Sequence, residues 1–563
     1  MNFFDFAWST VTQITKKSHN ELKILLHDDL RYPYLGKDIR GFVLHLIKPK
    51  RLSEKCVYFH GLKFDLQNPT HKKIIWYLFK SSVYHLALHS HLSDFSVYSK
   101  WAQGKSHNLS TFVISLIEDA IINEHLKRSF RWMLPEIAYA NAISFLLMKD
   151  IDKLPNDISQ AMASILQEYA LGKVKGKLKD DVLMDVKAIT SILRGIRENL
   201  TEDSRVDAAN KIYDALTVYG EPFEVPSLLH AECHGTNDLF YEQHIPREED
   251  IQPIFTDALN IFESESKSEA QLQNLLQSLK EGESHQVLTT WQEQERSKLK
   301  ILKDYAQIGK DTPFEDFEFP AEDYAEFQRR RELLGSPIRR IMHQLRLLKN
   351  VEGEDFRQES GFVDLQEAIQ VIASKSQRTD IFVREELQTR EDTWSILIDA
   401  SHSLNMFKGE VRGIALCLAE VAKTLILNQN SWGMYAFNNK FYVIKDFSER
   451  FNAQVKARIG GLTHGGLTYL PDAVLLAAQA LTKKLETAKV LVIVSDFFPS
   501  GYDGAEEKLK ENLKKIERMG VGVIGIGVKS RAVKNYIRVN CVVENPYDLM
   551  KKFTKAFIEF SVG

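Results

Sequence analysis

The chain has little of what secreted, membrane-spanning or nucleic-acid-binding proteins need. Only four cysteines occur in 563 residues, and their wide separation fits neither a zinc finger nor a disulfide framework, so we expect a reducing cytoplasm. No apolar run approaches the length of a membrane span, and the N-terminus lacks the basic and long apolar regions of a signal peptide. The formal net charge of -3 gives no reason to expect nucleic acid as a partner.

The sequence also contains no nucleotide-binding loop of the Gly-x-x-x-x-Gly-Lys-Ser/Thr type. Any ATP hydrolysis linked to this protein must therefore come from another chain. What is present is ordinary for a folded globular protein: 44% of the residues are hydrophobic and 26% are charged. The length predicts two or three domains.

The most informative stretch is an apolar run that ends in Asp-x-Ser-x-Ser. Residues 394–398 predict one buried strand, and Asp399, Ser401 and Ser403 follow it directly. Two further elements come later in the chain. A Gly-Gly-Leu-Thr segment ends at Thr468 before a helical run, and a second apolar strand ends at Asp496. Open α/β sheets place their ligands at the carboxyl ends of strands, and hard oxygen ligands of this kind suit Mg²⁺.

This ordered set resembles the metal-ion-dependent adhesion site (MIDAS) of a von Willebrand factor A (VWA) domain. The resemblance implies one divalent cation, Mg²⁺ by default or else Mn²⁺ or Ca²⁺. It implies that the hydroxyls touch the metal directly or nearly so, while the carboxylates act through waters and hydrogen bonds. One coordination position stays open for a carboxylate of another protein. The alternative is a doubly wound domain with chance polar residues in its loops. The implied metal residues are Asp399, Ser401, Ser403, Thr468 and Asp496.

Beyond residue 391, predicted strands and helices alternate, which indicates an α/β fold. The implied VWA domain is Rossmann-like, with a mainly parallel sheet and helices on both faces. His402 and His464 fall in the predicted site loops, where we expect ordinary loop residues rather than catalysts. Besides the two strands above, strands are predicted at 432–437, 441–447, 520–528 and 541–544, and helices at 409–428, 470–485, 505–519 and 547–560.

The region before residue 230 is predicted to be mainly helical. A short helix is expected at 20–27 and a strand at 41–46, before a long, mostly apolar helix at 72–92. A second long helix is expected at 112–126. From residue 231 to 360 the chain is polar and charged, which predicts exposed linkers with helices near 269–281 and 286–307. The arginines at 329–331, 339, 340 and 346 predict a basic, solvated or partner-facing helical surface.

The helix at 72–92 carries a possible second metal site. His85 and His89 are four residues apart, so both could grip one metal ion from the same helix face. The spacing is that of the zincin helix His-Glu-x-x-His, but Leu86 stands where the general-base Glu should be. Glu118 on the next helix would be the third ligand. Two interpretations stay open: a degenerate Zn²⁺ site, or a helical core with hydrogen-bonded His and Glu.

The residues around 361–403 point to one group within the proteins that contain VWA domains. Gly361-x-x-Asp364 before a helix, Asp380-x-x-x-Arg384 in a strand and Arg390-x-Asp392 before the site resemble NorD/CbbO-type VWA proteins. The resemblance implies pairing with a MoxR-type AAA+ ATPase, and a client metalloenzyme that offers an Asp or Glu to the metal. The predicted domains are 1–230, a linker region 231–360, a lead-in segment 361–390 and the VWA domain 391–563.

Two other function classes remain beside this adaptor. A zinc metallopeptidase would use His85 and His89, but the missing general base argues against it. A cobaltochelatase-like subunit would also join an acidic linker to a C-terminal VWA domain, but the N-terminal match is poorer. We therefore expect a binding protein without an enzymatic activity of its own.

Overall fold

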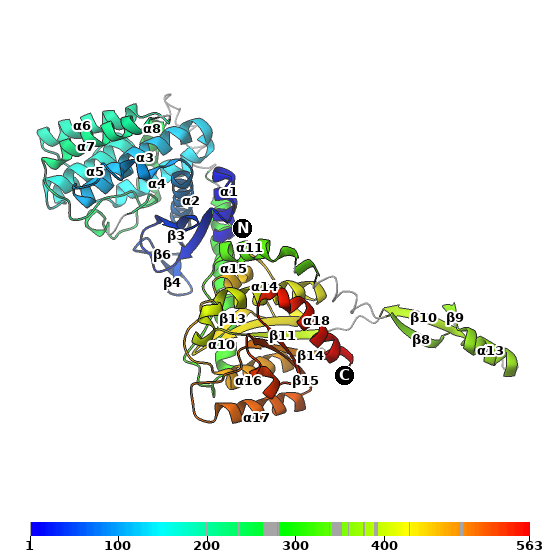
Figure 1. Ribbon diagram of the computed structural model, residues 1–563. Coiled ribbons are helices and arrows are strands. Elements are labelled where there is room, and N and C mark those ends of the chain that lie inside the picture. Colours follow the sequence, from blue (N-terminus) through cyan, green and yellow to red (C-terminus); the bar gives the residue numbers. More distant parts are fainter. Residues whose placement is uncertain are drawn as a thin grey trace. The chain divides into compact units, whose positions relative to one another are not determined.

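A computed structural model describes residues 2–198, 200–233, 237–262, 279, 281–336, 338–340, 352–358, 360–374, 378–387, 392–426, 428–484 and 488–562. The chain divides into two compact units, Met1–Arg296 and Ser297–Gly563, and each is described by itself (Figure 1). Among the described helices, none combines the length and the apolar character that crossing a membrane requires. The predicted domain limits at residues 230, 360 and 390 stay predictions.

The first unit combines two small sheets with a helical bundle. Strands β1 to β3 form one sheet in the order β1-β3-β2, and β4 to β6 form another in the order β4-β5-β6. The elements are α1 (Phe3–Thr15), β1 (Leu22–His27), β2 (Tyr34–Asp38), β3 (Gly41–Ile47), β4 (Lys50–Arg51), β5 (Cys56–Phe59), β6 (Leu62–Asp65), α2 (Pro69–Leu92), α3 (His107–Ser129), α4 (Leu134–Leu147), α5 (Asp157–Leu171), α6 (Asp180–Gly195), α7 (Glu202–Thr217) and α8 (Glu248–Phe262).

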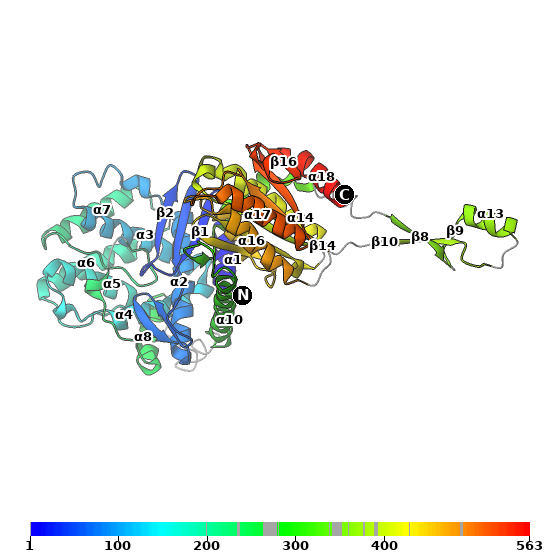
Figure 2. The same cartoon turned by 90° about the horizontal axis from the view of Figure 1, so that it is seen from below.

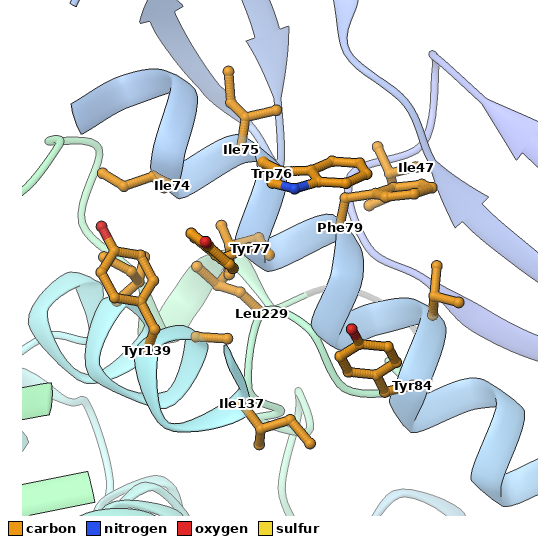
Figure 3. Packing of buried hydrophobic residues seen from close by; sticks show 14 of the residues in the cluster. Ile47, Ile74, Ile75, Trp76, Tyr77, Phe79, Tyr84, Ile137, Tyr139 and Leu229 are labelled. Carbon is orange, nitrogen blue, oxygen red and sulfur yellow. The ribbon is translucent and has the colours of Figure 1, made fainter. Parts of the chain in front are cut away.

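Helix α2 is the centre of this unit. It contacts α1, α3, α4 and β3, and Figures 1 and 2 show it between the strands and the other helices. Its side chains are buried on all faces from Lys72 to Ser90, polar ones such as Lys80 included. Figure 3 shows Trp76 and Phe79 beside Ile47 of β3. The Asn68 side chain caps the helix by accepting the Thr70 N–H at 2.9 Å. The helix that carries the two predicted histidines is thus held firmly.

The helix predicted at 20–27 is wrong, because Leu22–His27 forms strand β1. This segment pairs in parallel with β3, from Leu22 beside Phe42 to His27 beside Ile47. Leu22 and Ile24 are buried while the residues between them are less so, which is the two-residue alternation of a half-buried strand. Pairing with β3 and burial of one face override the local preference. The strand predicted at 41–46 and the helices predicted at 72–92 and 112–126 are confirmed.

The region predicted as exposed linker contains two helices whose apolar residues are buried in hydrophobic cores. Helix α8 buries Ile251 and Phe255 in the first unit. Helix α10 (Glu281–Ile308) buries Trp291 in the first unit and Tyr305 in the second, so the limit between the units falls inside it. The helix predicted at 286–307 is confirmed by α10, whereas α8 is not predicted from the sequence. Arg346 and residues 269–278 of the helix predicted at 269–281 lie outside the described residues.

The second unit contains a seven-stranded sheet in the order β16-β15-β14-β11-β12-β13-β7. All neighbouring strands are parallel except the β12–β13 pair. The elements are β7 (Phe317–Glu318), α11 (Tyr324–Leu333), β11 (Asp392–Asp399), α14 (Lys408–Leu425), β12 (Trp432–Phe437), β13 (Phe441–Lys445), α15 (Ala453–Gly460), α16 (Leu470–Thr482), β14 (Ala488–Ser495), α17 (Ala505–Arg518), β15 (Val521–Val528), β16 (Val539–Val543) and α18 (Pro546–Val562).

Helices cover both faces of this sheet, as the sequence predicts. Ile396 and Ile398 of β11 belong to the core under α14 and α18, whereas Leu397 between them belongs to the core under α16 and α17. Figure 1 shows these helix pairs on opposite sides of the strands. The prediction of an α/β unit with a mainly parallel sheet is confirmed. Helix α15 and the short edge strand β7 are not predicted from the sequence.

The arginines of α11 serve the fold of the second unit. Arg330 donates to the backbone oxygen of Gly409 at 2.8 Å and pairs with Glu326 at 2.5 Å. Arg331 pairs with Glu420 of α14 at 3.3 Å. The prediction of a solvated or partner-facing basic surface is wrong for Arg329, which is buried, whereas Arg331 is exposed as predicted even though its charge is paired.

The lead-in segment 361–390 contributes to a small sheet in the order β8-β10-β9. Helix α13 follows β9, where the sequence predicts a helix, and a strand lies at the predicted 380–384. Leu365, Ile369 and Ile372 of α13 are all exposed, although their spacing places them on one helix face. The elements are β8 (Glu352–Gln358), β9 (Phe362–Val363), α13 (Leu365–Ser374) and β10 (Phe382–Leu387).

Candidate metal centres

The two predicted aspartates leave the same edge of the second unit's sheet. Strands β11 and β14 are parallel neighbours, and their register pairs Ile398 with Val494. Asp399 ends β11 and Asp496 directly follows β14, so both carboxylates lie at the carboxyl edge. The short helix η5 (His402–Phe407) begins just beyond Ser401. Parallel strands of equal register thus bring together residues that are far apart in the sequence.

The Asp399 side chain stabilises the loop that carries Ser401 and Ser403 by accepting hydrogen bonds. One carboxylate oxygen accepts the Ser401 N–H at 2.9 Å, and the other accepts the Ser495 hydroxyl at 2.6 Å. The Ser401 and Ser403 hydroxyl oxygens lie 3.0 Å apart. Ser495 is not predicted as a site residue, although its polar side chain at the end of an apolar strand is a signal. The aspartate therefore places two hydroxyl oxygens side by side at the sheet edge.

Backbone hydrogen bonds tie the Thr468 loop to its neighbours. The Gly465 N–H donates to Ala400 O at 2.9 Å, and Thr468 and Ser500 exchange two hydrogen bonds at 3.0 and 3.1 Å. Gly466 has a φ of 75°, and an added Cβ would lie 2.4 Å from the Asn439 side-chain oxygen. Glycine is therefore required there by both backbone conformation and space. The loops that carry the predicted residues form one connected rim.

The electrostatics of this edge favour a cation. Asp399, Ser401, Thr468 and Asp496 are all buried. Burial, and after it the nearby charge of Asp496, together raise the pKa of Asp399 to about 7. The charged neighbour is thus a second carboxylate rather than a lysine or arginine. Two buried carboxylates beside hydroxyl oxygens are the donor set that Mg²⁺ prefers, so the residues present fit such an ion.

Large apolar side chains lie next to the polar residues of this edge. Met406 in η5 is 88% exposed, Leu467 immediately before Thr468 is 42% exposed, and Phe498 two residues after Asp496 is 61% exposed. We call these three residues the apolar rim. Exposed apolar residues near a polar centre are typical of a surface that binds another protein.

The two histidines of these loops take no part in the hydrogen bonds above. His402 is exposed. His464 is half buried, neither of its ring nitrogens has a hydrogen-bond partner in the described part of the chain, and burial lowers its pKa to about 4. Their predicted role as ordinary loop residues stays a prediction.

The first unit holds a second cluster, made by His85, His89 and Asp119. The Nε2 atoms of the two histidines are 3.0 Å apart. The Asp119 Oδ1 atom lies 3.0 Å from the His89 Nε2 atom and 3.3 Å from the His85 Nε2 atom. The Nδ1 atom of His89 is 2.9 Å from the Ser93 hydroxyl, which orients the ring. Three ligand-type atoms thus converge from helices α2 and α3.

The structure places Asp119 beside the two histidines, and not Glu118, the predicted third ligand. Glu118 accepts the Tyr98 hydroxyl at 2.8 Å and forms an ion pair with Arg205 at 2.9 Å, and it is fully buried. Successive residues of a helix point about 100° apart, so only one of the two adjacent acids can meet the histidines. The sequence contains both acids, but it does not say which one faces α2.

The charge states of this cluster suit a metal ligand set. Burial lowers the pKa of His89, and the neighbouring His85 lowers it further. Burial alone would raise the pKa of Asp119, but the two imidazoles beside it hold that pKa below its usual range. His89 is therefore neutral and Asp119 ionised at neutral pH, which are the forms that bind metal.

A pocket of about 540 Å³ adjoins the cluster, and His85 and Asp119 line it. His230 also lines it, is 2% exposed, and its ring centre is 5.7 Å from that of His85. The Nδ1 atom of His230 and the Oδ1 atom of Asn141, another lining residue, have no hydrogen-bond partner among the described residues. Neither residue is predicted from the sequence, since His230 lies in an irregular segment far from both helices.

The sequence matches none of the protein-family models against which it was scanned. A search of the curated proteins found no match either.

Proposed function

We propose that this chain is a binding protein, and that its second unit is a VWA domain that recognises a partner through a divalent cation. Asp399, Ser401, Ser403, Thr468 and Asp496 would hold the ion, Mg²⁺ by default. When bound, the ion would offer one coordination position to an Asp or Glu of the partner. The observation that carries the proposal is a pair of buried carboxylates set beside hydroxyl oxygens at the carboxyl edge of a parallel sheet.

The hydrogen bonds of this site support recognition more than catalysis. Both oxygens of Asp399 already accept hydrogen bonds, from the Ser401 N–H and the Ser495 hydroxyl. Asp399 is thus used to shape the loop and is poorly placed to remove a proton from a substrate. The Ser401 and Ser403 hydroxyls face each other rather than a basic side chain. Two hydroxyl oxygens held side by side in this way can serve as ligands of a cation.

The apolar rim supports a protein partner over a small molecule. Met406, Leu467 and Phe498 are exposed beside the polar residues, and burying them would add hydrophobic contact around a central charged interaction. Interfaces between proteins commonly combine a few such apolar anchors with one desolvated polar centre. A partner carboxylate flanked by apolar side chains fits this arrangement.

The resemblance to NorD/CbbO-type proteins extends the proposal to an adaptor role. The chain would couple a MoxR-type AAA+ ATPase to the activation or remodelling of a client metalloenzyme. The sequence has no nucleotide loop, so the ATPase must act in trans. We assign the client to the metal site of the second unit and the ATPase to the helices of the first.

Magnesium titration of the full-length, chelator-treated protein tests the metal site. We expect one Mg²⁺ to bind to the unaltered protein and none to the double variant Ser401→Ala/Ser403→Ala. Asp503→Asn is the matched control, because it removes an exposed carboxylate from the loop after Asp496 and leaves the site intact. The site assignment fails if calorimetry detects no Mg²⁺ binding, or if the double variant binds as well as the control does.

Co-precipitation with a MoxR-type ATPase from the same genome tests the adaptor role. We expect the full-length chain to bind the ATPase and to change its ATP turnover. The double serine variant should keep this binding, because the metal site is assigned to the client. Absence of binding by the unaltered chain would reject the adaptor role while leaving the metal site standing.

A further inference from the structure

The three ligand-type atoms of the first unit have the spacing of a metal coordination sphere. Ligand atoms of a tetrahedral zinc ion lie about 2.0–2.2 Å from the metal, and hence roughly 3.3–3.6 Å from one another. The three separations in this cluster are 3.0, 3.0 and 3.3 Å. Outward shifts of a few tenths of an ångström would therefore admit an ion at their centre.

The surrounding structure holds these atoms in place. Both histidines project from α2, which is buried on all faces, and the Ser93 hydroxyl lies 2.9 Å from His89 Nδ1. A hydrogen bond on the second ring nitrogen fixes the orientation and the tautomer of a metal-binding imidazole. With Nδ1 donating to Ser93, the Nε2 lone pair of His89 is directed at the cluster. This arrangement is the one that a ligand histidine requires.

Unsatisfied polar atoms next to the cluster point to a further ligand. His230 and Asn141 are 2% and 3% exposed, and both line the pocket that His85 and Asp119 also line. The Nδ1 atom of His230 and the Oδ1 atom of Asn141 lack hydrogen-bond partners among the described residues. Buried polar atoms are normally satisfied, so a bound polar molecule in this pocket accounts for both.

We propose that His85, His89 and Asp119 form a mononuclear site for a divalent transition-metal ion, with an open coordination position that faces this pocket. The open position takes water or another small oxygen- or nitrogen-donor ligand, within reach of His230 and Asn141. Mixed imidazole and carboxylate ligands suit zinc or ferrous iron better than the hard cations expected at the sheet edge. The proposal does not rest on the proposed function, because the two sites share no residue and differ in donor type.

Metal analysis of the full-length protein is the direct test. The protein is purified without added metal, analysed for bound zinc and iron, stripped with chelator and titrated with Zn²⁺ and Fe²⁺ in excess Mg²⁺, which occupies the oxygen-donor site. We expect one transition-metal ion per chain. His89→Gln and Asp119→Asn should each lower its affinity by more than the roughly 10- to 100-fold typical of changes around a metal site. His91→Gln should leave it unchanged, since His91 lies on the same helix but is exposed.

Cobalt substitution tests the open position. Azide added to the Co²⁺-loaded protein should shift the visible absorption bands, and His230→Ala should keep the cobalt but alter the azide affinity. Matched thermal unfolding of the stripped variants shows whether they are folded. The proposal is overturned if the folded, unaltered protein binds neither Zn²⁺ nor Fe²⁺, which would make the cluster a hydrogen-bonded triad. An equal loss of metal affinity in His91→Gln and His89→Gln would also overturn the proposal, because it would indicate that the ion binds at the surface.

Discussion

Replacement of Asp399 by asparagine should stabilise the metal-free protein at neutral and higher pH. Asp399 is fully buried, and its burial together with Asp496 raises its pKa from 3.8 to about 7. In the unfolded chain the same carboxyl has its ordinary pKa. The folded, metal-free state therefore opposes the ionisation of this group, and asparagine, which has no charge, removes that penalty.

The size and the sign of the effect follow from linkage. A difference of about three pKa units corresponds to about 4 kcal/mol. Below pH 4 the carboxyl is protonated in both states, so the penalty is absent. Between pH 4 and 7 the unfolded chain releases the proton while the folded one keeps it, and the unaltered protein loses stability as pH rises. Above pH 7 the full penalty is present.

Part of this gain is offset by a weaker hydrogen bond. The Ser495 hydroxyl donates to Asp399 at 2.6 Å, and an asparagine amide in that place cannot accept it. This loss costs about 1–2 kcal/mol. The expected net stabilisation of Asp399→Asn is thus about 2–3 kcal/mol at pH 8, with slight destabilisation at pH 4.

Urea unfolding in chelator, followed by thiol labelling of Cys417, measures this effect in the second unit alone. Cys417 is a free, fully buried cysteine of α14, so it reacts only when that unit opens. The urea concentration at the unfolding midpoint should decrease for the unaltered protein as the pH is raised from 5 to 8. For the variant it should not decrease. Added Mg²⁺ should raise the urea midpoint of the unaltered protein again, but not that of the variant. Parallel pH profiles would refute the view that burial and the charge of Asp496 oppose the ionisation of Asp399 in the folded, metal-free protein.

Three other substitutions have clear expected outcomes. Gly466→Ala should weaken Mg²⁺ binding in calorimetry by straining the loop of Thr468, whereas Gly465→Ala should not, because an added Cβ there meets nothing within 4 Å. Leu86→Glu should destabilise the first unit by several kcal/mol in urea unfolding and create no casein cleavage, because Leu86 is fully buried; a chelator-sensitive peptidase activity would contradict this. Arg205→Met should cost about 3–5 kcal/mol by leaving Glu118 buried without its cation, and an unchanged unfolding midpoint would contradict it.

The sequence predicts the second unit well because its signals are local. The strands β11, β14 and β15 are apolar runs bounded by polar residues, and each run is long enough to form one buried strand of a sheet. Alternation of such runs with amphipathic helices implies parallel pairing, since a crossover is needed between parallel neighbours. The strand ends then locate Asp399 and Asp496 at one edge. Their role in binding a metal stays a prediction.

The first unit is predicted less well because its signals depend on packing. Whether residues 22–27 form a helix or a strand depends on the partner strand β3, which supplies the hydrogen bonds. Helix α8 lies in a stretch that is polar and charged on average, but its own apolar face buries Ile251 and Phe255. The buried face of a short amphipathic element cannot be predicted until the surface against which it packs is known.

The sequence by itself determined the residue types of both sites: hydroxyls and carboxylates at the ends of strands, and two histidines one helical turn apart. Only the tertiary structure decided which acid of the Glu118–Asp119 pair meets those histidines, because that depends on the rotation of α3 against α2. It also brought His230 to the pocket beside them from a segment with no sequence signal. Spacing along one element is set by local geometry, whereas the meeting of separate elements is set by how their buried faces pack.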